Sequence, residues 1–74
     1  SPEAGVLRRE RSIALESALG QIAADARAAL ILSGQGFSGA DIARTIGRSE
    51  AATRTLMSRA RVQLRRILET QEDA

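Results

Sequence analysis

The residues with the clearest chemical potential in this sequence are the arginines between positions 44 and 66. All eleven basic side chains of the 74-residue chain are arginine, and seven of them lie in this segment against one acid, Glu50, which gives it a net charge of +6. The planar guanidinium group can donate paired hydrogen bonds to a phosphate or to a guanine edge. This concentration of charge predicts a nucleic-acid partner, and its alternative is a solvated arginine face.

Other chemistries find little support in the composition. The sequence contains no cysteine and no histidine, so it offers no thiol nucleophile, disulfide or imidazole ligand. Asp25, Asp41 and Glu50 do not form a carboxylate cluster in this interpretation, because each falls at the start of an expected helix, where capping and the helix dipole explain it. A core of this size also leaves little room for a buried pocket. We therefore expect no enzyme, catalytic residue, metal, cofactor or small-molecule substrate.

The hydropathy pattern argues against a membrane role. The longest apolar run, "AALIL" at 28–32, is much shorter than the roughly 20 residues that span a bilayer, and the N-terminal stretch lacks the layout of a signal peptide. The expected location is the cytoplasm, with no membrane partner.

The elements that must position the arginines are predicted to be helices only. Alanine, leucine and arginine are frequent and Phe37 is the single aromatic residue, which favours an all-α fold. Apolar periodicity and capping signals predict four helices, the last two forming a helix-turn-helix. The expected helices cover 10–19, 24–33, 39–46 and 50–69, after a linker or frayed helix start at 1–9 and before an acidic tail at 70–74.

The junction between the third and fourth segments carries the strongest local signals. Ser38 and Ser49 are expected N-caps, with Asp41 placed for a capping box, and Gly47 supplies a bend that favours positive φ. A short capped helix, a tight turn and a longer basic helix have the spacing of a helix-turn-helix, in which the second helix enters the major groove of DNA. An ordinary helical hairpin is the alternative.

The apolar residues predict which side of each helix is buried. In the fourth segment the expected inward stripe consists of Ala52, Leu56, Ala60, Leu64 and Ile67 or Leu68. Phe37 and Met57 are expected in the core rather than in a partner interface.

The segment "IAADARAALIL" followed by "GQGFSGADIARTIGRSEAATRTLMSRARVQLRRIL" resembles the fourth conserved region of the extracytoplasmic-function sigma factors. These bacterial RNA polymerase subunits read the minus-35 element of promoters. The resemblance covers about residues 13–68, with "SRAR" and a leucine three residues later as its most specific piece. The matching positions are Ile22 and Arg27; Gly36, Phe37, Ser38, Ile42, Ala43, Ile46 and Gly47; and Ser49, Thr53, Arg54, Thr55, Arg59, Ala60, Arg61 and Leu64.

This resemblance implies a role for individual residues. Base contacts are expected from Arg54, Thr55, Ser58 and Arg59, with Arg59 as the first choice for guanine. Phosphate contacts are expected from Arg48, Ser49, Thr53 and Arg61. For Arg61, as for Arg65 and Arg66, a solvated face or a contact with polymerase is the alternative. The implied partners are promoter DNA, the β-flap of the RNA polymerase core and an anti-sigma factor.

Three positions depart from the family pattern. Ala23 stands where the family has proline, Asp41 where it has glutamate, and Leu56 where it has arginine. The last change removes a charge from the expected recognition helix and is predicted to alter how tightly DNA is held.

Two other functions remain compatible with the sequence. One is the DNA-binding domain of a LuxR-type response regulator, which shares the four-helix plan but not the "SRAR" ending. The other is a sigma-like decoy that binds only an anti-sigma factor. Such decoys can lose basic residues on the recognition helix, whereas this chain keeps Arg54, Arg59 and Arg61, which favours DNA binding. We expect the region that opens the minus-ten element to lie outside these 74 residues, so that the chain binds DNA weakly by itself.

Overall fold

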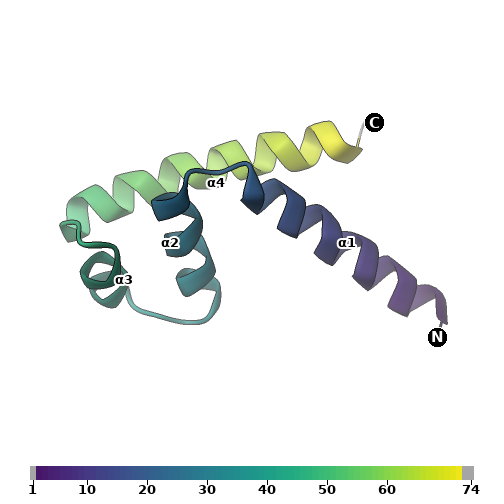
Figure 1. The fold of residues 1–74 in the computed structure, drawn as a ribbon, viewed down its shortest axis with the longest axis horizontal. Helices are drawn as coiled ribbons and strands as arrows, with labels where there is room; N and C mark the ends of the chain where they lie inside the picture. Colours follow the sequence, from purple (N-terminus) through teal and green to yellow (C-terminus); the bar gives the residue numbers. More distant parts are fainter. Residues whose placement is uncertain (1, 73–74) are drawn as a thin grey trace.

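The computed structural model describes residues 2–72, and within that range it contains four helices and no strand (Figure 1). The helices are α1 (Pro2–Gly20), α2 (Ala24–Gly34), α3 (Gly39–Ile46) and α4 (Glu50–Glu72). The predicted all-α class is confirmed. None of these helices combines the length and the apolar character needed to cross a membrane.

Helix α1 starts well before the expected residue 10. It begins at Pro2, a residue suited to the first helical turn because it lacks an N–H that would need a partner. Its buried residue is Ala18, near its C-terminal end, and the first half of the helix leads away from the other three (Figure 1). Residues 2–9 are therefore helical but exposed, apart from a half-buried Gly5, while Ser1 lies outside the described residues.

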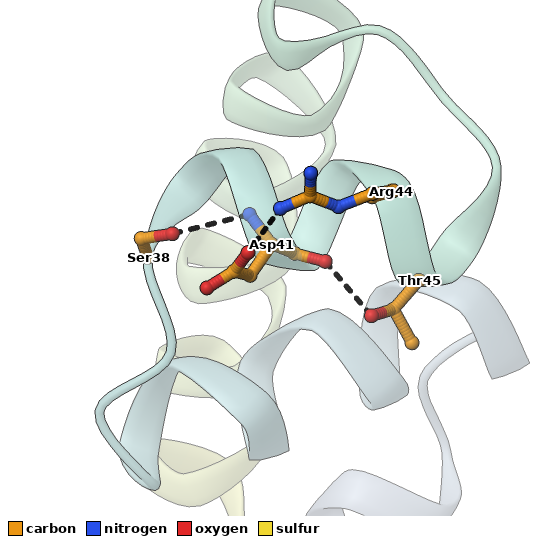
Figure 2. Close-up of polar contacts among 4 residues, drawn as sticks. All are labelled: Ser38, Asp41, Arg44 and Thr45. Carbon is orange, nitrogen blue, oxygen red and sulfur yellow. Dashed lines mark hydrogen bonds and ion pairs between the residues drawn. The ribbon is translucent and has the colours of Figure 1, made fainter.

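Helices α2 and α3 match the predicted segments closely, and local capping sets the end of α2 and both ends of α3. After α2, Gly36 adopts a φ of 93°, and the Phe37 N–H donates to the Leu32 carbonyl over 3.1 Å. At the start of α3, the Ser38 hydroxyl oxygen accepts from the Asp41 N–H over 3.1 Å (Figure 2). The Asp41 carboxylate itself pairs with Arg44 one turn along α3, rather than completing the expected capping box (Figure 2).

The turn between α3 and α4 has the expected glycine geometry. Gly47 has a φ of 73° and a ψ of 33°, in the left-handed region, and the Arg48 N–H donates to the Ala43 carbonyl over 3.0 Å. This bond closes a Schellman-type helix end. Arg48 is thus held by its backbone next to the start of α4.

Helix α4 continues past the predicted end at 69 and reaches Glu72, while residues 73–74 of the expected acidic tail lie outside the described range. Two contacts hold this part of α4 against the domain, and the second lies beyond residue 69. Ile67 packs against the core, and the Gln71 side-chain amide reaches the Ser17 hydroxyl of α1 over 3.4 Å. Packing against α1 therefore outweighs the unfavourable acidic residues at this end of the helix.

The core consists of two small clusters along the inner side of α4. Ile22, Ala26 and Ala60 form the first, and Ala29, Ile42 and Met57 form the second. The predicted inward stripe is confirmed at Ala60, which is buried, and at Leu56, Leu64 and Ile67, which are partly buried. The prediction is wrong for Ala52, which is exposed, because the buried position of that turn belongs to Thr53.

Candidate nucleic-acid interface

The start of α4 is rigidly defined by its cap. The Ser49 hydroxyl oxygen accepts from the Ala52 N–H over 3.0 Å, and the Ser49 carbonyl accepts from the Thr53 N–H over 2.9 Å. With Gly47 closing α3, these bonds fix the angle between the two helices of the helix-turn-helix. Ser49 is exposed, and its hydroxyl hydrogen can still be donated to an anion beside the helix N-terminus.

The outer side of α4 carries the polar residues that were predicted to face bases. Because Thr53, Met57 and Ala60 point into the core and the half-buried Leu56 packs against it, the other positions of these turns point outward. All four predicted residues are exposed and lie within the first three turns of the helix: Arg54, Thr55, Ser58 and Arg59. Together these four side chains offer two guanidinium groups and two hydroxyls, which can form hydrogen bonds to base edges.

One neighbour of this set was not among the predicted contacts. Val62 lies one turn beyond Ser58 and Arg59 and is 43% exposed, although it is apolar. Helical spacing from Thr55 and Ser58 could have placed it on the outer side, where an apolar side chain can contact a thymine methyl group.

Both of the arginines predicted to bind phosphate have hydrogen-bond partners within the domain. Arg48 donates through Nη2 to Oδ2 of Asp25 over 3.0 Å, and both side chains are about half exposed. Arg61 reaches the Ser33 hydroxyl of α2 through Nη2 over 3.4 Å, a long and therefore weak hydrogen bond. Arg61 thus leans toward α2, while Arg48 lies beside the start of α4.

The expected phosphate contact by Thr53 does not fit the structure. Thr53 is 2% exposed, and its hydroxyl donates to the Ser49 carbonyl over 2.8 Å. A phosphate cannot reach a hydroxyl that is enclosed between α4 and the core. Thr53 is therefore a core residue that supports the capped turn.

The two residues expected in the core behave differently. Met57 is 7% exposed and belongs to the second cluster, as predicted. The prediction is wrong for Phe37, which is 49% exposed. Phe37 lies in the loop before α3 and lines a shallow hollow of about 260 Å³ together with Ile42, Met57 and the two flanking arginines, Arg54 and Arg61.

The departure at Leu56 has a structural explanation. Leu56 is half-buried and packs against the cluster of Ile22, Ala26 and Ala60. A side chain at this position faces the body of the domain, so the change from the arginine of the family pattern removes no charge from the outer side of α4.

A short capped helix, a glycine turn and a basic recognition helix, all supported by α2, define a helix-turn-helix DNA-binding domain. The family model "Sigma-70, region 4" matches residues 12–64, which is most of the chain. The chain therefore belongs to the sigma-70 region 4 family, the part of a sigma factor that recognises the minus-35 promoter element and works with RNA polymerase. Comparisons with curated proteins and with solved structures gave no significant match.

Proposed function

We propose that this chain reads the minus-35 element for a sigma factor of the extracytoplasmic-function subclass. In this proposal Arg54, Thr55, Ser58 and Arg59 contact bases. The observation that carries it is the position of these four exposed side chains directly after a capped helix start, opposite the buried side of α4. Residues near the start of a recognition helix are those that reach base edges in the major groove.

Phosphate contacts in this proposal come from three residues. Ser49 offers its hydroxyl at the helix N-terminus, and Arg48 and Arg61 offer guanidinium donors that are now held only by exposed or long contacts. Exposed pairs of this kind contribute little stability and can be exchanged for a phosphate.

The polymerase partner is proposed to bind a surface that shares only Arg61 with the proposed DNA contacts. A hollow of about 450 Å³ lies between α1, α2 and α4, and its apolar wall includes Leu15, Leu19, Leu30 and the 43% exposed Ile31. We propose this hollow as the docking surface for the β-flap of RNA polymerase, and for an anti-sigma factor that would compete with it. The proposed setting is the bacterial cytoplasm, and catalysis belongs to polymerase rather than to this chain.

The decisive test is a selection from a random duplex library at low salt, followed by titration of an Arg59→Ala variant. The parent chain should enrich one motif. Arg59→Ala should weaken binding to that motif by about 1 to 3 kcal/mol and change binding to scrambled DNA much less, because a paired guanine contact is lost.

Arg9→Ala is the matched control, since it removes the same charge from the exposed first half of α1. It should lower affinity for both duplexes slightly and equally. If the parent enriches no motif but binds an anti-sigma factor tightly, the chain is a sigma-like decoy and the proposal that it recognises a promoter is wrong.

A further inference from the structure

An ion pair connects the start of α2 to the turn that precedes the recognition helix. Among residues 2–72 two ion pairs are formed, and the pair of Asp41 with Arg44 lies within α3. The pair of Asp25 with Arg48 is different because it joins two elements 23 residues apart, with 3.0 Å between Arg48 Nη2 and Asp25 Oδ2. Asp25 therefore does more than complement the dipole of its own helix.

The backbone holds Arg48 where an anion would be bound. Its N–H donates to the Ala43 carbonyl over 3.0 Å, and the next residue is Ser49, the cap of α4. The first N–H groups of α4 and its dipole favour a negative group at this end. The backbone of Arg48 thus lies next to this helix N-terminus, while its guanidinium is held by the carboxylate of Asp25.

A carboxylate and a phosphate use the same chemistry toward arginine. Both present anionic oxygens that accept charge-assisted hydrogen bonds from the guanidinium donors. The Asp25 carboxylate also neutralises the charge with which Arg48 would attract DNA from a distance. Because the carboxylate is 55% exposed, its attraction is weak enough for DNA to overcome.

We propose that Asp25 is an intramolecular competitor of DNA phosphate for Arg48. The inference rests on the proposed function, because Arg48 must lie on the DNA backbone. Asp25 lowers the affinity of the domain for DNA of every sequence, while the base contacts of Arg54 and Arg59 are unaffected. The pair thus weakens the binding of the domain to promoter and non-promoter DNA alike.

The test combines Asp25→Asn with Arg48→Gln in a double-mutant cycle. Binding of the parent, both single variants and the double variant is titrated on the selected duplex and on a scrambled duplex, at several salt concentrations. Asp25→Asn should tighten binding to both duplexes about two- to five-fold, the range of an exposed ion pair. It should also steepen the slope of log affinity against log salt, by at most about one unit. In the Arg48→Gln background it should have no effect.

Two controls separate this mechanism from simpler ones. Glu50→Gln removes the same charge from the turn next to Arg48, and its effect should be the same in both backgrounds, because Glu50 is not the partner of Arg48 in the described structure. Asp25→Glu keeps the carboxylate and should restore binding close to that of the parent. Thermal melts confirm that each variant is folded at the titration temperature.

The possible outcomes lead to different conclusions. Tighter binding by Asp25→Asn that persists with Arg48→Gln would assign the effect to net charge and overturn the proposal. Weaker binding, or none of the expected change, would also overturn it and would assign Asp25 to orienting Arg48 or to folding alone. If the parent binds neither duplex, the proposed function itself fails, and that result is visible before any variant is compared.

Discussion

Thr53 illustrates how one hydroxyl can serve the fold rather than the DNA surface. Its side chain is 2% exposed and donates to the Ser49 carbonyl over 2.8 Å, while the same carbonyl accepts the Thr53 N–H. Local bonding of this kind lets a small polar residue occupy a buried helical position without an unsatisfied donor.

Thr53→Val is therefore expected to leave DNA binding unchanged. Valine has nearly the same shape and removes one hydrogen bond, while the Ser49 carbonyl keeps the backbone N–H, so the free energy of unfolding should fall by about 1 kcal/mol or less. Denaturant unfolding and duplex titration measure the two effects. A clear loss of DNA affinity with unchanged stability would instead indicate that Thr53 contacts a phosphate.

Single residues were harder to predict from sequence than their segments. Thr53 is polar and was expected on the surface, but it is buried. Phe37 is apolar and was expected in the core, but it is 49% exposed. Burial depends on which turn of α4 meets α2 and on where the loop before α3 passes, and residue type does not encode either. The partnership of Asp25 with Arg48 was also missed, because a contact across 23 residues leaves no periodic signal.

At the scale of elements, the predicted boundaries are accurate where local chemistry sets them. Gly36 and Gly47 end α2 and α3 through positive φ, and Ser38 and Ser49 begin α3 and α4 through side-chain caps. The exposed polar side of α4 follows from helical periodicity in the same way. By contrast, the end of α4 depends on packing against α1, which sequence alone does not reveal.

The turn before α4 leads to a prediction about Gly47. Gly47→Ala should lower the free energy of unfolding by about 1 to 2 kcal/mol, since a side chain is disfavoured in the left-handed region. Apart from Gly47 and its two chain neighbours, no residue has an atom within 4 Å of the position an added Cβ would occupy, so the loss comes from the backbone conformation and not from a clash.

Gly39→Ala is the matched control in the same helix-turn-helix. Space around Gly39 is equally open, but Gly39 begins α3 without a positive φ. Alanine there should raise stability by about 0.4 to 1 kcal/mol by restricting the unfolded chain. Equal effects of the two substitutions in denaturant melts would show that the positive φ of Gly47 carries no strain for alanine.

At the scale of the whole molecule, the shape is extended by the first helix. The radius of gyration is 14.0 Å, whereas a compact chain of this length has about 11 Å. The family match begins at residue 12, shortly before the half-buried Ala14 and the buried Ala18 of α1. The first half of α1 is thus helical without contributing to the core.

The two ends of the chain should therefore differ in what they contribute to stability. Among the described residues, removing residues 1–8 takes away exposed positions only, apart from the half-buried Gly5, and an isolated helical stretch of this length is marginal in water. We expect the melting temperature to stay nearly constant and the radius of gyration in X-ray scattering to decrease.

Removing residues 67–74 deletes the same number of residues from the other end but has a different expected result. It takes away Ile67, which packs on the first core cluster, and Gln71, which bonds to Ser17 of α1. Each kcal/mol lost from a domain of this size lowers the melting temperature by roughly 4 to 8 °C, so a drop of several degrees should be visible by circular dichroism. Equal losses at both ends would contradict this division, because the start of α1 would then stabilise the domain as much as the end of α4 does.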